Sequence, residues 1–452
     1  MEEKVRNKAK KQTTLSTSDF PTSAEIIEAY SREFANYIAP RGDTVFGFWM
    51  QTIADLQFLD LELMGLTEDY EIDPIARTVS FSGDAEFLRL RVAHLEKVKG
   101  KPTLYTRFVD GFGDTNAYAF HNLYPYKGKF YPRVVRTLIN AFGLKSGSLL
   151  LDPFNGSGTA THEASLMGIK SIGIDVTPIG IIISQLKNDL LFSDGKRLDF
   201  TLAELQDVLE DIEAKRWDHP DPLIQKLMWL IYFDTVDAFA RTSRYHRKGK
   251  LGLFVEKLNY IRNCHRITME IRDAENLRFE PAEIVEGDVL ELRSLEDFKE
   301  RFDACITSPP YYFSIDYVGK DKIAYEYLGV DMKRIESRYL GMKGGTDAGL
   351  RGRYGSLPTR VAMYYEDLRE SISNIYWALK PGAKLAIIVG DSSVAGKKIP
   401  TTMMTKRFCE EAGFRFERLI FNPLLGTRNR AIRGESVIIC EKRSDNPKLR
   451  FL

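Results

Sequence analysis

Residues 305–313, which read CITSPPYYF, combine residue types that could act on an amino group. The two prolines, Pro309 and Pro310, remove two backbone N–H donors and stiffen the turn after an apolar run. The Ser308 hydroxyl and the Pro309 carbonyl are then outward-facing acceptors, and Tyr311 can stack on a ring. Two such acceptors can hold the hydrogens of an exocyclic amine while positive charge develops on its nitrogen. An aromatic face beside them suits a base swung out of a duplex. Taken alone, the turn is also compatible with a purely structural strand end.

A second segment, residues 149–159, reads LLLDPFNGSGT and has the features of a ligand-binding turn. An apolar strand ends at Asp152, and Gly156 and Gly158 precede a helix whose first N–H groups lack partners. Asp175 ends the next apolar run, where an acidic side chain can accept both hydroxyls of a ribose. Asp152 would repel a pyrophosphate, but its charge suits the cationic end of S-adenosylmethionine.

The elements around these segments alternate between strands and helices. A strand at 149–152, a helix at about 159–167 and a strand at 171–175 form a βαβ unit, which is typical of a parallel, doubly wound sheet. Helical patterns then interrupt the sheet, strands resume near residue 284, and the runs 419–421 and 436–440 predict a hairpin. The predicted fold class is α/β.

DPFNGSGT and SPPY together resemble two motifs of one enzyme family. The first resembles the cofactor motif of S-adenosylmethionine-dependent amino-methyltransferases that act on nucleic acid bases, and the second resembles the catalytic motif of their cytosine-N4 type. The resemblance covers roughly residues 121–185 and 284–442, and it implies a Rossmann-like methyltransferase sheet. It implies cofactor binding by Asp152, Phe154, Asn155, Gly156, Gly158, Thr159, Asp175 and Asp288, and catalysis by Ser308, Pro309, Pro310 and Tyr311.

Within the cofactor set, the resemblance implies a division of roles. Asp152, Asn155 and the two glycines would line the methionine part, Asp175 would hold the ribose, and Asp288 would face the adenine amine. The segment 121–132 resembles the part of these enzymes that closes over the methionine moiety.

The rest of the chain surrounds this core without a motif that assigns it a role. A helical pattern runs from residue 23 to about residue 66. The helical insert, residues 186–280, is our first candidate for recognition of the target sequence in the nucleic acid. The Gly- and Arg-rich stretch 313–360 and the N-terminal region, residues 20–115, are the alternatives. We predict a flexible tail (1–19), an N-terminal α+β region of unknown role (20–115), a methyltransferase core (116–185 and 281–443) and a helical insert (186–280).

Local charge is more informative about a nucleic-acid partner than total charge. Lys and Arg number 64 against 63 Asp and Glu, which gives a net charge of +1. Basic stretches offset by acidic ones nevertheless occur near the motifs, and Lys and Arg neutralise phosphates. The residues that we predict to contact DNA are Arg241, Arg244, Arg247, Lys248, Arg351, Arg353 and Arg428.

Composition excludes several other classes. No apolar run approaches the ~18 residues that span a bilayer, and the start of the chain lacks the apolar stretch of a signal peptide. The four cysteines are scattered without a CxxC pair, so we expect neither a disulfide framework nor a metal site, and a reducing, cytoplasmic location. A monomer and a dimer are both compatible with the sequence.

We therefore expect a DNA (cytosine-N4) methyltransferase that acts on duplex DNA, with a cognate restriction endonuclease as a partner to test for. Methylation of cytosine C5 needs an attacking thiolate, usually from a Pro-Cys turn, and the chain has no Pro-Cys dipeptide. The alternatives are an adenine-N6 DNA methyltransferase, a tRNA guanine-N2 methyltransferase, and an inactive DNA-binding subunit with a methyltransferase core.

Overall fold

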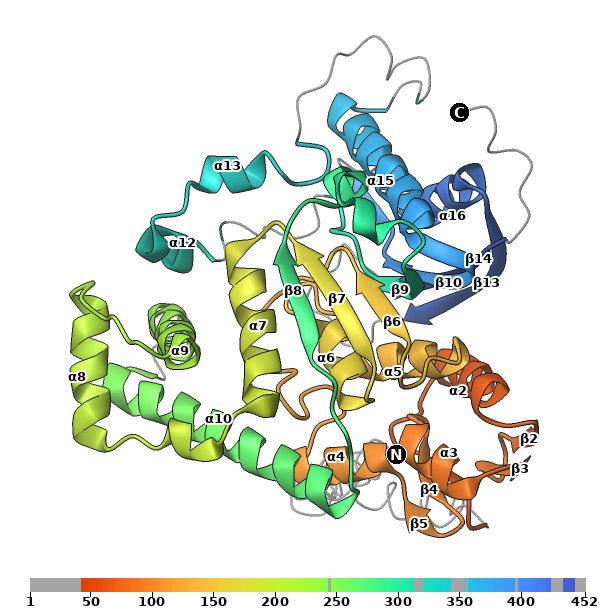
Figure 1. Cartoon of the computed structure of the whole chain (residues 1–452), viewed down its shortest axis with the longest axis horizontal. Helices are drawn as coiled ribbons and strands as arrows, with labels where there is room; N and C mark the ends of the chain where they lie inside the picture. Colours follow the sequence, from red (N-terminus) through yellow and green to blue (C-terminus); the bar gives the residue numbers. More distant parts are fainter. Residues whose placement is uncertain are drawn as a thin grey trace, which may run out of the picture.

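The computed structural model describes residues 42–242, 245–312, 319, 321–342, 354, 357–394, 397–423 and 434–443. Two sheets of more than two strands organise these residues: a seven-stranded central sheet and a smaller five-stranded sheet near the N-terminal end (Figure 1). No helix in these ranges is both long and apolar enough to cross a membrane.

The central sheet has the strand order β13-β14-β10-β9-β6-β7-β8. Five neighbouring strands, from β10 to β8, are parallel, while β14 runs antiparallel to β10 and pairs with β13 as the predicted hairpin. This arrangement confirms the predicted Rossmann-like α/β fold. The strands are β6 (Leu149–Asp152), β7 (Lys170–Asp175), β8 (Ala282–Glu286), β9 (Phe302–Thr307), β10 (Leu379–Val389), β13 (Phe414–Pro423) and β14 (Gly434–Lys442).

Alternation along the strands divides the apolar side chains between two layers of helices. In β9, Ala304 and Ile306 pack into a core formed with α2, α5 and α6, whereas Cys305 between them packs into a core formed with α15 and α16. Both faces of the sheet are therefore buried, as expected of a parallel sheet. These helices are α2 (Ile53–Leu66), α5 (Pro132–Ala141), α6 (Thr159–Leu166), α15 (Thr359–Ala378) and α16 (Thr401–Ala412).

The helical insert occupies the crossover between β7 and β8 and lies against α7 (Figure 1). Its buried Leu227 and Phe254 belong to the same apolar core as Ile183 of α7. The insert is thus packed onto the sheet's outer helix. Its elements follow α7 (Pro178–Phe192) as η2 (Gly195–Leu198), α8 (Leu202–Glu213), α9 (Pro222–Arg241) and α10 (Gly249–Ala274).

The N-terminal region forms the second sheet, in the order β2-β3-β1-β4-β5, and packs its helix α2 against α5 of the core. The sequence prediction of a continuous helix up to residue 66 is wrong here. Along the described part of the chain, β1 comes before α2. The helix begins only after Thr52, whose side chain makes a capping box with Asp55. The remaining elements are β1 (Val45–Phe46), β2 (Asp69–Asp73), β3 (Thr78–Ser82), α3 (Ala85–Arg91), β4 (Leu95–Val98), β5 (Lys101–Pro102) and α4 (Leu104–Phe112).

Short elements border the carboxyl ends of the central strands. The 3-10 helix η4 follows β8, and α12 and α13 follow β9. Chain order reverses between β6 and β9, which places a crevice at the ends of these two strands. The bounds are η4 (Val289–Ser294), η5 (Glu296–Phe298), α12 (Lys322–Leu328), α13 (Met332–Glu336), β11 (Ser392–Val394) and β12 (Lys397–Ile399).

Candidate active site

The two predicted motifs meet at adjacent strand ends. β6 and β9 pair in parallel, with Leu150 opposite Ala304 and Leu151 opposite Cys305. This register places Asp152 beside Thr307, whose hydroxyl donates a 2.6 Å hydrogen bond to Asp152 Oδ1. The ligand-binding turn and the Ser-Pro-Pro-Tyr turn therefore leave the sheet side by side.

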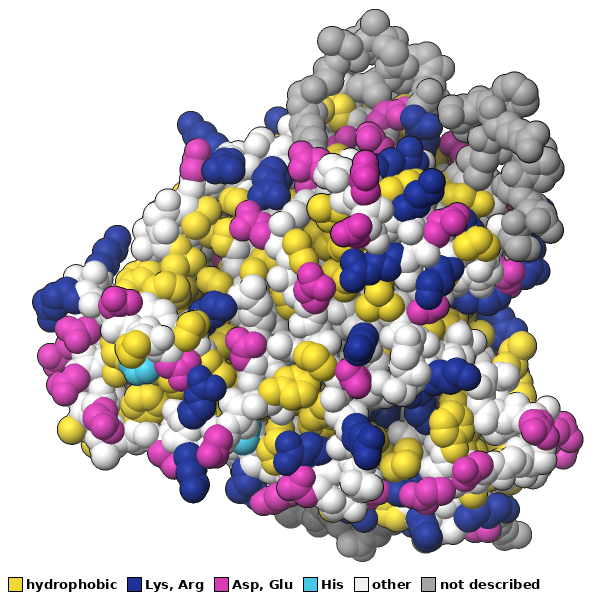
Figure 2. Space-filling model, viewed as in Figure 1, with side chains coloured by type: hydrophobic (Ala, Val, Ile, Leu, Met, Phe, Trp, Pro, Cys, Tyr) yellow, Lys and Arg dark blue, Asp and Glu magenta, His cyan; other side chains and the backbone are white. Residues whose placement is uncertain are grey.

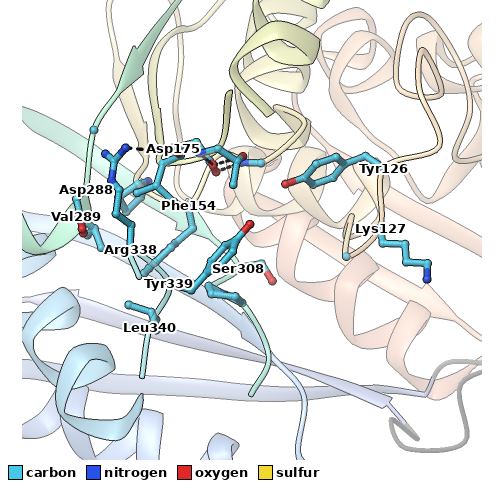
Figure 3. A pocket seen from close by; sticks show the side chains of 17 residues that line it. Tyr126, Lys127, Phe154, Asp175, Asp288, Val289, Ser308, Arg338, Tyr339 and Leu340 are labelled. Atoms are coloured by element: carbon cyan, nitrogen blue, oxygen red, sulfur yellow. Dashed lines mark hydrogen bonds between the residues drawn. The ribbon is translucent and has the colours of Figure 1, made fainter. Parts of the chain in front are cut away.

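A cavity of about 630 Å³, counted with its open mouth, lies above these strand ends (Figure 3). Its lining combines residues of the two predicted sets. From the predicted cofactor set it takes Phe154, Gly156, Asp175 and Asp288, and from the predicted catalytic set it takes Ser308 and Pro310.

The turn after β6 depends on its glycines. Gly156 and Gly158 have φ angles of +49° and +74°, which residues other than glycine rarely adopt. A Cβ atom on Gly158 would lie 2.8 Å from Ser184 Cβ, and one on Gly156 would lie 3.2 Å from the Tyr126 ring. The turn can therefore pass close to both α7 and the segment that precedes α5.

Asp175, at the end of β7, holds this turn and also lines the cavity. Its Oδ2 accepts a 2.6 Å hydrogen bond from the Gly156 amide, and its Oδ1 accepts from the Thr177 amide and hydroxyl at 2.8 and 2.5 Å. Burial raises the pKa of Asp175, although these donors oppose the shift. The carboxylate is preorganised at the position where the prediction puts a ribose.

Asp152 lies beneath the cavity floor rather than on it. Its Oδ1 accepts from Thr307 and from the Phe154 amide, while its buried Oδ2 has no hydrogen-bond partner within the described part of the chain. Burial raises the pKa of this fully enclosed carboxyl to about 7. A buried carboxylate with an unmatched oxygen attracts a cation bound nearby.

Three other predicted cofactor residues also support the turn without lining the cavity. Asn155 Oδ1 accepts a 2.9 Å hydrogen bond from Thr161, and its side chain packs against Gly173 of β7. Gly158 is the residue before α6, and the buried Thr159 begins that helix. Asp288 does line the cavity, and its side chain caps η4 through the Leu290 amide at 3.0 Å.

Ser308 lines the cavity and is anchored to the neighbouring strand β10. Its hydroxyl donates a 3.0 Å hydrogen bond to the carbonyl of Ile388 in β10. Since the hydroxyl hydrogen is engaged there, the oxygen lone pairs are left to accept. Tyr364 of α15 donates a 3.0 Å bond to the carbonyl of Pro310, which fixes the far side of the turn. The buried Pro309 lies between these two anchored residues.

The side chain of Tyr311 is anchored to strand β14. Its hydroxyl donates a 2.9 Å hydrogen bond to Glu435 Oε1 at the start of β14, and its ring is 7% exposed. Burial raises the pKa of Glu435, which the Tyr311 hydroxyl opposes. No sequence pattern marked Glu435 or Tyr364 as functional, because both are distant from the turn along the chain.

Tyr126, Lys127 and the consecutive residues Arg338, Tyr339 and Leu340 also line the cavity (Figure 3). The first two belong to the segment 121–132, whose resemblance to a cofactor-covering segment was the signal for them. No sequence signal marked the other three.

The predicted DNA-contacting residues that the structure describes, Arg241, Arg247 and Lys248, do not line this cavity. Arg241 pairs with Asp237 at 2.7 Å, Lys248 pairs with Glu256 at 2.5 Å, and Arg247 is exposed. Exposed ion pairs of this kind are weak, so phosphates can displace the acidic partners. Arg244, Arg351, Arg353 and Arg428 are outside the described residues.

Other exposed basic side chains lie on α12 and α13, the helices that precede Arg338 along the chain. Lys322 of α12 and Lys333 and Arg334 of α13 are exposed, and α13 ends two residues before Arg338, which lines the cavity. Figure 2 shows Lys and Arg side chains over this part of the molecule, at the upper left. No sequence pattern singled out these three residues.

Comparisons with known proteins point to nucleic-acid methyltransferases. No protein-family model matches the chain. The type II methyltransferase M.BsoBI of Geobacillus stearothermophilus is 23% identical over 77% of this chain and 88% of its own. A tRNA (guanine(10)-N2)-dimethyltransferase of Methanocaldococcus jannaschii is 40% identical over 30% of this chain and 35% of its own. Among solved structures, the rRNA methyltransferase aviRa of Streptomyces viridochromogenes aligns with a TM-score of 0.33 and 14% identity, covering 70% of this chain and 87% of that one.

Proposed function

We propose that this protein transfers a methyl group from S-adenosylmethionine to the exocyclic N4 of cytosine in duplex DNA. One observation carries the proposal: Ser308 and Pro310 line the same cavity as Phe154, Asp175 and Asp288. The Ser308 hydroxyl, one of the two acceptors suited to an amine, and the groups suited to the cofactor therefore face one space. Similarity to a type II methyltransferase along most of the chain supports DNA as the substrate.

The residues of the cavity fit S-adenosylmethionine. Asp175 and Asp288 offer carboxylate oxygens to the ribose hydroxyls and the adenine amine, and the side chains of Phe154 and Val289 suit the faces of a flat ring. Burial raises the pKa of the Asp152 carboxyl below the floor to about 7, and a cationic ligand nearby would favour its ionised form. When bound, S-adenosylmethionine supplies an electrophilic methyl group.

Ser308 and Pro309 would prepare the amine for attack. The lone pair of an exocyclic amine is delocalised into the ring, which makes the nitrogen a poor nucleophile. Acceptance of its two hydrogens by Ser308 Oγ and the Pro309 carbonyl favours a tetrahedral nitrogen whose lone pair can attack in line. These acceptors also stabilise the positive charge that develops on nitrogen. The proton can leave after transfer, so the reaction needs no histidine base.

The target base would reach this turn only after leaving the DNA stack. Tyr311, fixed by Glu435, would form one wall of its pocket. Phosphates would contact the exposed basic residues of the insert and of α12 and α13. In this role the protein is the modification half of a restriction–modification pair, and the partner is an endonuclease that cuts the unmodified site.

The experiment that tests the proposal compares two nucleic acids and identifies the product. Purified protein is incubated with radiolabelled S-adenosylmethionine and either duplex DNA or tRNA, and the labelled polymer is digested to nucleosides. We expect label in DNA, as N4-methylcytosine. N6-methyladenine as the sole product would refute the cytosine assignment, and label in tRNA alone would refute DNA.

The second candidate, tRNA guanine-N2 methylation, has one observation in its favour, the 40% identity to a tRNA enzyme over 30% of the chain. Absence of label from both polymers, with cofactor bound, would instead favour an inactive DNA-binding subunit.

A further inference from the structure

Residues 338–341, which we call the strap, form a wall of the cavity that no motif marks. They follow α13, and the side chains of Arg338, Tyr339 and Leu340 line the cavity together with Phe154 and Ser308 (Figure 3). The rest of the lining comes from strand ends and from the segment before α5. Among the described residues that line the cavity, only those of the strap directly follow α12 and α13 along the chain.

Arg338 ties the first end of the strap to the ends of β7 and β8. Its Nη1 lies 3.1 Å from Glu286 Oε1 and 3.5 Å from the carbonyl oxygen of Val176. Its side chain is 23% exposed, whereas that of Glu286 is 60% exposed. The guanidinium thus bridges from the strap to the side of the cavity that carries Asp175 and Asp288.

Gly341 ties the second end to α15. Its amide donates a 2.7 Å hydrogen bond to Asp367 Oδ2. Its φ is +79°, and a Cβ atom there would lie 2.9 Å from Tyr364 Cβ, so the backbone approaches α15 as closely as a glycine allows. Tyr364 also holds the Pro310 carbonyl. The strap is consequently fixed at both ends, to the cofactor side and to the catalytic side.

We propose that the strap holds the nucleoside part of the cofactor against the strand ends, and that Arg338 is the positioning residue that keeps it closed. The inference rests on the proposed function only in taking S-adenosylmethionine as the ligand of the cavity. Asp175 and Asp288 offer acceptors from the sheet, and Tyr339 and Leu340 offer an apolar surface from the strap. A nucleoside between them leaves only when the strap moves.

Loss of the Arg338 contacts should therefore speed cofactor release without altering methyl transfer. Arg338 contacts Glu286 and Val176, and the acceptors of the catalytic turn are held by other residues. A change in the dissociation constant of about 5- to 15-fold corresponds to about 1–1.6 kcal/mol, which is the net contribution of one partly exposed hydrogen bond.

The test uses the full chain and S-adenosylhomocysteine, the demethylated cofactor, as the probe. We would measure its dissociation constant by calorimetry, its release rate by rapid displacement, and kcat on DNA at saturating cofactor. Arg338→Ala should raise the dissociation constant about 5- to 15-fold through faster release, with kcat changed less than about twofold. Glu286→Gln should have a smaller effect, because the Val176 carbonyl remains, and the double variant should match Arg338→Ala.

Arg334→Ala is the matched control, since Arg334 is an exposed arginine of α13 that does not line the cavity. Its cofactor affinity should equal that of the wild type. An unchanged cofactor affinity in Arg338→Ala, or an equal loss of affinity in Arg334→Ala, would overturn the proposed role of the strap.

The same measurements separate the strap from the proposed function. If the wild type does not bind the probe, both are wrong. If it binds the probe and methylates DNA while neither Arg338→Ala nor Glu286→Ala changes release, only the strap is wrong. Glu286→Ala removes the acceptor that glutamine would keep, on a mostly exposed side chain, and should also speed release of the probe; unchanged release would overturn the strap's proposed role even if Arg338→Ala does not fold.

Discussion

Replacement of Asp152 by asparagine should make the stability of the protein less dependent on pH. Burial raises the pKa of Asp152 from its usual 3.8 to about 7. Because the folded state disfavours the charged carboxylate, the contribution of Asp152 to stability is lost as the pH rises from about 4 to about 7. A shift of about three units corresponds to about 4 kcal/mol in full. Asparagine does not titrate, so this loss disappears.

The effect can be measured by comparing how much the unfolding free energy changes between two pH values in the wild type and in Asp152→Asn. Between pH 5 and pH 8, the ionisation of Asp152 alone should lower the unfolding free energy of the wild type by roughly 2–3 kcal/mol. Urea denaturation of the wild type and Asp152→Asn at both pH values gives the comparison. The new amide nitrogen lacks a buried acceptor and costs about 1–3 kcal/mol, but equally at both pH values. Parallel pH dependence in the two proteins would refute the account of Asp152.

The same variant tests the link to the cofactor. Asparagine can still accept from Thr307 and from the Phe154 amide, as Asp152 does, but it carries no charge. We expect weaker binding of S-adenosylmethionine and loss of the rise in affinity between pH 6 and pH 8 that ionisation of Asp152 gives the wild type. Equal affinity and equal pH dependence in both proteins would mean that no cation is bound near Asp152.

Other variants separate chemistry, cofactor binding and folding. Ser308→Ala should lower kcat about 10²- to 10³-fold and leave cofactor affinity unchanged, whereas Asp175→Ala should weaken cofactor binding in calorimetry; an equal loss of binding in both would contradict these roles. Tyr311→Phe and Glu435→Ala should each lower kcat/KM for DNA, and adding Glu435→Ala to Tyr311→Phe should cost little more, while Glu435→Gln keeps the acceptor and most of the activity. Additive losses would show that the two residues act separately. Gly158→Ala should lower the unfolding free energy by about 1–3 kcal/mol in urea denaturation, because its φ is +74° and the new Cβ meets Ser184; an unchanged midpoint would contradict the strained turn.

The sequence predicted best where structure is decided by neighbouring residues. The βαβ unit, the glycine turn and the proline turn follow from local apolar periodicity and from the backbone limits of Gly and Pro. The hairpin predicted from the runs 419–421 and 436–440 is present as β13 and β14. The failure at residues 45–46 has the opposite cause. β1 exists because it pairs with β3 and β4, whose residues Thr78 and Lys97 are far along the chain.

Residue roles within the candidate site show the same division. DPFNGSGT and SPPY indicated two turns of one active site, and the structure brings Asp152 within hydrogen-bond reach of Thr307, 155 positions later. The sequence could not tell that Asn155 would support the turn from below, because that depends on where Gly173 of the next strand lies.

The amino-acid sequence by itself determined the fold class and the residue types at the two turns, since these depend on local periodicity and on backbone freedom. Only the tertiary structure decided which side chains close the cavity. Arg338 contacts Glu286 across 52 positions, and Glu435 contacts Tyr311 across 124. Such contacts depend on how elements distant in sequence pack together, which no local pattern records.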